Sequence, residues 1–115
     1  MKRVALFVFN GDPVCFIHVL LNGLDMKEKG MEGRIIVEGA ATALLPKLVD
    51  PANALHKLWE KAKTQGIVDG VCKGCGHKMG GAEEAVQQGL ALLEDMSGHP
   101  SMVRYIEAGF EVISF

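Results

Sequence analysis

The sequence predicts a small α/β protein, a three-layer sandwich built on a mostly parallel sheet of the flavodoxin-like type. Apolar runs typical of buried strands alternate with segments of helical periodicity along the whole chain. The length of 115 residues corresponds to a single domain, 1–115, which excludes a two-lobed enzyme. With 49% hydrophobic and 23% charged residues, the chain is too apolar for disorder and too often interrupted by charge for a membrane protein.

The first half of the chain contains two predicted strands and one long helix. Val4–Phe9 is an apolar run without polar alternation, which is typical of a strand buried on both faces. Asp12-Pro13 then opens a helix to Lys29, because Asp caps free amides and Pro fits the first helical position. The apolar arc of this helix is wider than one face, which predicts a contact with another subunit. A second strand is expected at Arg34–Glu38.

The second half continues the alternation of helices and strands. Residues 41–52 are expected to form a short helical turn, because Pro46 prevents a longer helix. Trp59 belongs to the apolar face of the next helix. The other predicted elements are a helix from Asp50-Pro51 to Thr64, a strand at Ile67–Val71, a helix at Ala82–Met96, a short helix from His99-Pro100 to Gly109, and a closing strand at Phe110–Phe115.

The predicted architecture also predicts where a site lies. In open parallel sheets, ligands bind beyond the carboxyl ends of the strands, where the strand order reverses. Three loops qualify here, at 10–12, 38–41 and 72–80.

One of these loops carries a C-x-x-C motif, Cys72-Lys73-Gly74-Cys75. A cysteine reacts as the thiolate, so its surroundings must lower its pKa. Two thiols at this spacing also allow one to attack a mixed disulfide or persulfide on the other. The groups expected to lower the thiol pKa are Lys73, His77 and the backbone amides near Gly74 and Gly76.

Two other interpretations of the motif remain open. Cys72 and Cys75 can be two small core residues at the end of a strand. They can also bind zinc with His77, and Cys15, His18 or His99 are then candidates for the fourth ligand. A second tight pair of ligands, usual in structural zinc sites, is missing from the sequence. The glycine spacing around the motif does not fit a dinucleotide fingerprint, so no cofactor is expected.

Composition also limits compartment and partners. The three cysteines are an odd number, and the apolar run at the N-terminus is short for a signal peptide, so we expect a cytoplasmic protein without a disulfide framework. No segment is long enough to span a membrane. The net charge is −2 and the basic residues are scattered, which argues against a nucleic-acid partner. The apolar surplus predicts a homo-oligomer.

The sequence resembles the DsrE-like family, which includes the YchN and sulfur-relay branches. The resemblance rests on Gly66-x5-Cys72-Lys73-x-Cys75-x4-Gly80, on the strand that opens at Asn10-Gly11 into a helix, and on the ending Glu111–Phe115. It implies a small α/β sandwich that assembles as trimers or hexamers. It also implies that Cys72 carries sulfur as a persulfide, with Cys75 as the second cysteine of the C-x-x-C branch.

Two functional hypotheses follow. In the first, the protein is a sulfur-relay protein, in which Cys72 takes sulfane sulfur from a donor persulfide and passes it to a protein or small thiol. Cys75 resolves or shuttles that sulfur, and Asn10 and Gly11 form the opposite wall of the site. In the second, the protein is a non-catalytic homo-oligomeric binding protein, with a small anion or zinc at the same loop.

Overall fold

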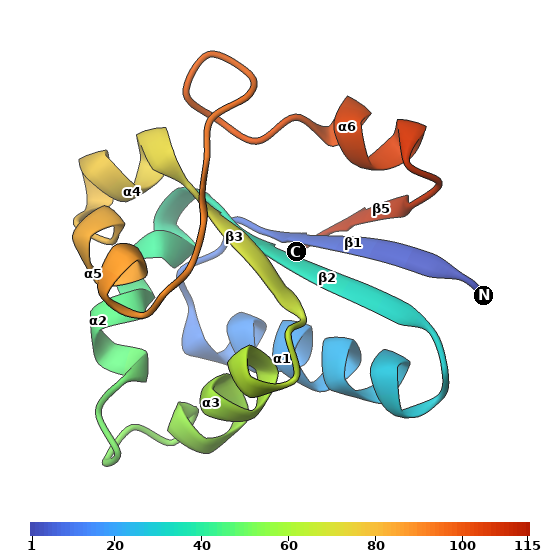
Figure 1. Ribbon diagram of the computed structural model, residues 1–115. Coiled ribbons are helices and arrows are strands. Elements are labelled where there is room, and N and C mark those ends of the chain that lie inside the picture. Colours follow the sequence, from blue (N-terminus) through green and yellow to red (C-terminus); the bar gives the residue numbers. More distant parts are fainter.

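A computed structural model covers residues 1–115 and contains one sheet of five parallel strands in the order β4-β3-β2-β1-β5 (Figure 1). The strands are β1 (Arg3–Val8), β2 (Glu32–Val37), β3 (Val68–Cys72), β4 (Leu92–Leu93) and β5 (Glu111–Ser114). The α-helices are α1 (Pro13–Glu28), α2 (Leu45–Leu48), α3 (His56–Thr64), α4 (Lys73–Met79), α5 (Ala82–Gln87) and α6 (Met102–Glu107), and a 3₁₀ helix, η1 (Gly39–Leu44), precedes α2.

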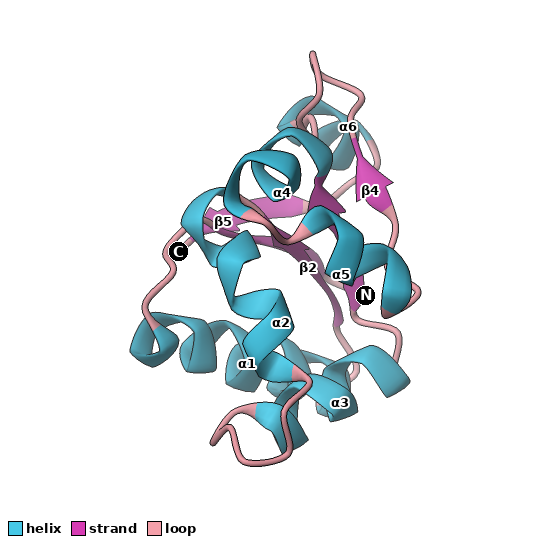
Figure 2. Cartoon of the chain, turned by 90° about the vertical axis from the view of Figure 1, so that its left-hand side faces the viewer, coloured by secondary structure: helices cyan, strands magenta, loops and turns pink.

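The two faces of the sheet are covered unequally. Helices α1 and α3 pack on one face, and α6 lies on the other (Figures 1 and 2). The face of α1 and α3 has a core cluster of 19 buried residues, whereas the face of α6 has a cluster of six. The arrangement confirms the predicted α/β class, with a sheet between two helical layers.

The long helix α1 begins as its sequence predicts. Pro13 is its first residue, and the Asp12 side chain accepts a hydrogen bond from the amide of Val14 at 2.9 Å. Phe16 packs against Trp59 with 5.9 Å between ring centroids, and both side chains are fully buried. The wide apolar arc of α1 is therefore largely used by the core of its own chain.

The region after β3 differs most from prediction. The helix predicted at Ala82–Met96 is wrong beyond Gln87, because Gly89 has a φ of 75° and turns the chain out of the helix. The edge strand β4 follows, and it buries Leu93. Met96, the last residue of the predicted helix, is exposed and lies outside any helix.

The predicted helix start at Asp50-Pro51 is also wrong. The Asp50 carboxylate accepts a hydrogen bond from the amide of Ala52, and the Asn53 side chain accepts one from the amide of Leu55. These side chains stabilise turns, and α3 begins only at His56. The short helical turn expected at 41–52 is present as η1 and α2.

The connections that follow β3 and β4 lie on opposite faces of the sheet. After β3 it passes through α5, where Ala85 belongs to the large core, and after β4 it crosses to α6, where Tyr105 belongs to the smaller one. A crevice at the carboxyl ends of these strands is the usual place for a ligand in such sheets. No helix is long and apolar enough to cross a lipid bilayer.

Candidate functional site

Four side chains that can bind metals or react as nucleophiles meet at the carboxyl end of the sheet. They are Glu38, Cys72, Cys75 and His99, and their ligand atoms all lie within 4.8 Å of one another. Glu38 directly follows β2, and Cys72 is the last residue of β3. Cys75 lies in the first turn of α4, and His99 in the segment between β4 and α6. We call these residues the carboxyl-end cluster.

Both thiols of the cluster approach the same imidazole nitrogen. His99 Nδ1 lies 3.0 Å from Cys72 Sγ and 3.6 Å from Cys75 Sγ. Cys72 also caps α4, because its sulfur accepts a hydrogen bond from the amide of Cys75 at 3.3 Å. Cys72 is fully buried, whereas Cys75 is half-buried and reaches solvent. The cluster thus contains one hidden and one accessible thiol.

A tight turn before α6 places the imidazole. The amide of Met96 donates to the carbonyl of His99 at 2.7 Å, and the amide of Gly74 donates to the carbonyl of Gly98 at 2.8 Å. Gly98 has a φ of 91°, a conformation that favours glycine. A Cβ atom on Gly74 would lie only 3.0 Å from Cε1 of His99. Glycine at position 74 therefore lets the imidazole ring pack against the start of α4.

Burial dominates the electrostatics of the cluster. It raises the pKa of Glu38 to about 7, and the hydrogen bond from the Cys72 thiol opposes the shift. Burial likewise raises the pKa of Cys72 to about 12, while the amide of Cys75 acts in the opposite direction. The sequence predicted a lowered pKa for this thiol, and that prediction is wrong. The cause is the complete enclosure of Cys72 beside Glu38 and Cys75.

The residues predicted to lower the pKa of the thiols make other contacts in the structure. Lys73 forms an ion pair with Glu94 at 3.1 Å, and His77 is exposed and does not belong to the cluster. Gly74 and Gly76 lie in helix α4, and the amide of Gly74 donates its hydrogen bond to the carbonyl of Gly98. Gly76 is buried, and a Cβ atom added at this position would lie 3.1 Å from the backbone of Ala82.

Asn10 and Gly11 lie in the loop after β1. The Asn10 side chain accepts a hydrogen bond from the amide of Asp12 at 2.8 Å. Gly11 lies so close to Ala40 that a Cβ atom would be 2.9 Å from its carbonyl oxygen. These residues shape the loop beside η1, and their role as a wall of the site stays a prediction.

The sequence did not predict the roles of two members of the cluster, Glu38 and His99. Glu38 was the end of a predicted strand and the start of the candidate loop 38–41, but no role was predicted for its carboxylate. His99 was considered only as one of three possible fourth ligands. Its position depends on the turn through Gly98, which no local pattern reveals.

A cavity of about 240 Å³ adjoins the cluster and includes Glu38 in its lining. The other residues that line it are mostly apolar and come from the end of β1 and the start of α6: Phe9, Met96, Pro100, Ser101, Met102 and Val103. Of the four cluster residues, Glu38 alone lines this cavity.

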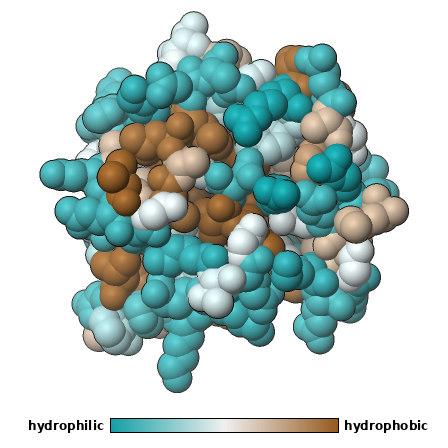
Figure 3. All heavy atoms as spheres, viewed as in Figure 1, coloured by the Kyte–Doolittle hydropathy of each residue, from teal (hydrophilic) through white to brown (hydrophobic).

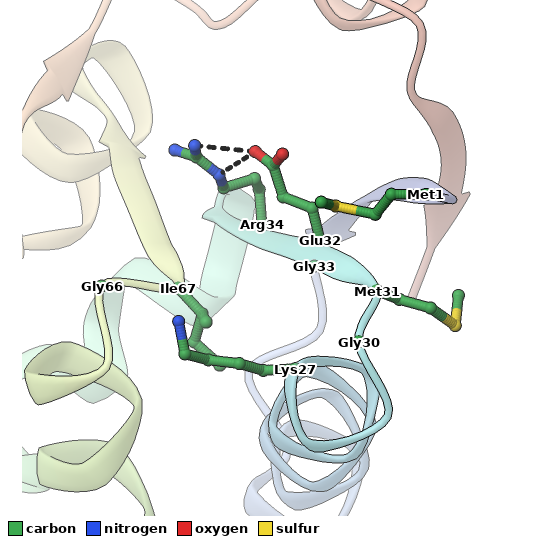
Figure 4. A pocket seen from close by; sticks show the side chains of 9 residues that line it. All are labelled: Met1, Lys27, Gly30, Met31, Glu32, Gly33, Arg34, Gly66 and Ile67. Carbon is green, nitrogen blue, oxygen red and sulfur yellow. Dashed lines mark hydrogen bonds and ion pairs between the residues drawn. The ribbon is translucent and has the colours of Figure 1, made fainter.

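A larger cavity of about 410 Å³ lies at the opposite end of the sheet (Figure 4). It is lined by nine residues at the amino ends of the strands: Met1, Lys27, Gly30, Met31, Glu32, Gly33, Arg34, Gly66 and Ile67. Its most prominent polar group, Arg34, is already paired with Glu32 at 2.7 Å. No cysteine or histidine lines it, whereas two cysteines and one histidine meet in the carboxyl-end cluster.

The fold and the cluster define a small parallel α/β protein with a thiol, imidazole and carboxylate centre at its carboxyl edge. A solved structure, a conserved protein of unknown function from Bacteroides thetaiotaomicron (BT1422), shares this fold with a TM-score of 0.64 and 18% identity, over 96% of this chain and 94% of that one. The similarity supports the three-layer α/β architecture.

The chain belongs to the same family as the uncharacterised protein MJ0733 of Methanocaldococcus jannaschii. The two are 33% identical over 118 residues, which cover 96% of this chain and 93% of that protein. An uncharacterised protein of Archaeoglobus fulgidus is 40% identical over 43 residues, or 37% of this chain and 70% of that protein. No family model matches the chain.

Proposed function

We propose that the protein is a cytoplasmic sulfur-relay protein of the DsrE-like type, which carries sulfane sulfur on a thiol of the carboxyl-end cluster. The observation that supports this most is the approach of two free thiols, Cys72 and Cys75, to one imidazole nitrogen at 3.0 and 3.6 Å. A thiol beside an imidazole is a nucleophile beside its base. A second thiol within reach allows sulfur to move between the two.

The accessible thiol, Cys75, is the first acceptor in this proposal. A donor persulfide has to bring its outer sulfur into contact with the attacking thiolate, and Cys72 has no exposed surface. Burial also keeps the pKa of Cys72 near 12, so this thiol stays protonated at neutral pH. The roles predicted for the two cysteines are thus exchanged, and Cys72 becomes the second thiol.

The transfer step balances without an added oxidant. His99 takes the proton of the Cys75 thiol, and the thiolate attacks the outer sulfur of a donor R–S–SH. The bond between the two donor sulfurs breaks, a new S–S bond forms on Cys75, and the leaving thiolate R–S⁻ takes the proton from His99. Attack by an acceptor thiolate on the outer sulfur of the Cys75 persulfide then regenerates Cys75.

Intact-protein mass spectrometry after incubation with a persulfide donor tests the proposal. We expect a mass increase of about 32 Da, reversed by reduction, that peptide mapping assigns to Cys75. Cys75→Ser should lose the adduct, and Cys15→Ser on α1 should keep it. An adduct of equal yield in Cys75→Ser and in Cys72→Ser would refute sulfur carriage by the cluster.

We also propose that the protein forms a homo-trimer or homo-hexamer, with sulfur donor and acceptor proteins as further partners. The face of α6 has the smaller core, yet Val103 and Ile106 are each 58% exposed there. Apolar side chains also gather over β3 and the adjoining edge of the sheet (Figure 3), where Val68, Leu90 and Leu92 are only partly buried. Burial of such surface favours self-association.

Light scattering coupled to gel filtration tests the assembly. The mass should correspond to three or six chains, and charges at Val103→Lys with Ile106→Lys should reduce it. Val14→Lys, at an exposed apolar position on α1, is the matched control. A monomeric mass for the unmodified chain would exclude the proposal.

A further inference from the structure

We infer that Glu38, Cys72, Cys75 and His99 together form a site for one thiophilic divalent cation of the zinc(II) type. The inference does not depend on sulfur transfer, since it needs only the four ligand atoms. It differs from the zinc set that the sequence suggested, in which His77 was the third ligand. Helix α4 leaves His77 exposed outside the cluster, and the turn before α6 supplies His99 instead.

The distances fit a small tetrahedral ion. Zinc bonds of about 2.0–2.3 Å separate neighbouring ligand atoms of a tetrahedron by about 3.3–3.8 Å. The two sulfur-to-nitrogen separations are 3.0 and 3.6 Å, and no pair of the four ligand atoms is more than 4.8 Å apart. Shifts of a few tenths of an ångström up to about 1 Å bring all four atoms to bonding distance.

The types of ligand also fit zinc. Two sulfurs, one imidazole nitrogen and one carboxylate oxygen are a soft to intermediate set, which selects zinc over magnesium or calcium. Magnesium and calcium prefer oxygen ligands in larger number. The His99 nitrogen that faces the sulfurs is free to coordinate, because its only polar neighbours are the two thiols.

The local charge balance favours a cation. Three groups of the cluster become anions when they bind a metal, and none of the eight ion pairs of the protein involves Glu38. The nearest sequence neighbour with positive charge, Lys73, is paired with Glu94. A divalent ion supplies the positive charge that the protein does not place there.

The scaffold holds the ligands before any ion binds. Cys72 is fixed as the N-cap of α4, and the bond between Gly74 and Gly98 ties the turn that carries His99 to the same helix. Glu38 is 5% exposed at the end of a central strand. Ligands held by three separate segments close to their final positions lose little entropy on binding.

Cobalt(II) and zinc(II) titrations of the reduced protein test the inference. We expect one ion per chain, visible d–d bands of a tetrahedral cobalt centre, a near-ultraviolet sulfur-to-cobalt band, and displacement of cobalt by zinc. His99→Gln and Glu38→Gln should each weaken zinc binding by about 100-fold or more, beyond what loss of an outer-sphere contact causes. The matched control His77→Gln should keep the affinity of the unmodified chain.

Several results would overturn the site. These are absence of a stoichiometric ion, a cobalt spectrum without the sulfur band, or an affinity unchanged by His99→Gln. Circular dichroism shows whether Cys72→Ser folds. If it does not fold, the cobalt spectrum of the unmodified chain and the zinc affinities of His99→Gln and Glu38→Gln still test the site. Because the readouts are metal content and spectra, a failure here is distinct from a failure of sulfur loading, which is measured on metal-free protein.

Discussion

The two ends of the parallel sheet differ in what their polar groups are free to do. At the amino end, the larger cavity is lined by Arg34 and Glu32, which are already paired at 2.7 Å, and Arg34 also pairs with Asp69 at 2.9 Å. At the carboxyl end, the cavity is smaller, but two thiols, an imidazole and a carboxylate meet without a lysine or arginine partner. The proposed site therefore rests on available ligand atoms and not on cavity size.

The topology explains the difference. Each strand of a parallel sheet delivers its last side chain to the same edge, where the chain turns into helices and loops. Cys72 ends β3 and at once caps a helix, which places a sulfur at a helix N-terminus. At the other edge, Arg3, Arg34 and Asp69 join neighbouring strand ends by ion pairs and hydrogen bonds. The amino end stabilises the sheet, and the carboxyl end carries the reactive groups.

The largest expected effect comes from removal of the imidazole. His99→Ala should slow persulfide loading by about 10²–10⁴-fold, because the variant lacks the group that accepts the Cys75 proton. Loading is followed by mass spectrometry over time at neutral pH in metal-free protein. Arg34→Ala, at the amino end, is the control and should load at the original rate. Equal loading rates in His99→Ala and Arg34→Ala would contradict the assignment of sulfur loading to the carboxyl end.

The second-largest effect is a pH dependence of stability that comes from Glu38 at the carboxyl end of the sheet. The folded pKa of Glu38 is about 7, above its unfolded value of 4.5, so the folded state holds its proton more tightly. Metal-free protein should therefore lose about 3 kcal/mol as pH rises from 4.5 through 7, and Glu38→Gln should remove this loss. Urea unfolding at pH 5 and pH 8 measures it. A pH dependence of the same size in Glu38→Gln would contradict the burial of Glu38.

A methyl group at the start of α4 should disturb only the carboxyl end. Gly74→Ala places a Cβ about 3 Å from the His99 ring, which has to shift away from the thiols. We expect zinc affinity to fall about tenfold to 100-fold, as for loss of an orienting contact. The control is Gly33→Ala at the amino end, where φ is not positive and the nearest atom to an added Cβ is Sδ of the flexible Met26 side chain at 3.3 Å. Similar zinc affinity in Gly74→Ala and the unmodified chain would show that the ring position does not matter.

The smallest effect should follow from breaking the amino-end pairs. Arg34→Met removes partly exposed ion pairs with Glu32 and Asp69, and should cost about 0.5–1 kcal/mol of unfolding free energy. Sulfur loading and zinc binding should not change. A clear loss of sulfur loading or zinc binding in a folded Arg34→Met protein would contradict the assignment of both to the carboxyl end of the sheet.

Local signals were enough to predict the scaffold of the site. The apolar run of β1, the cap at Asp12 and the glycine after α1 each act within a few residues, so the sequence shows them directly. Cys72 follows an apolar strand, and its place at the carboxyl edge was predicted for the same reason. Its partner Cys75 is one helical turn away.

The missed features depend on distant contacts. Strand β4 has two residues and exists because Leu92 and Leu93 pair with Val71 and Cys72. The approach of His99 to Cys72 spans 27 residues and relies on the turn at Gly98. The high pKa of Cys72 comes from complete burial, which the charged neighbours in the sequence concealed.

Sulfur loading of zinc-saturated and zinc-free protein tests most directly whether the carboxyl-end cluster acts as one chemical unit. In the proposed function, zinc bonded to both sulfurs occupies the atoms that would accept sulfane sulfur. Intact mass spectrometry should therefore show the gain of about 32 Da only in zinc-free protein, with loading restored after a chelator removes the metal. Equal loading rates and yields with and without one bound zinc per chain would contradict the account.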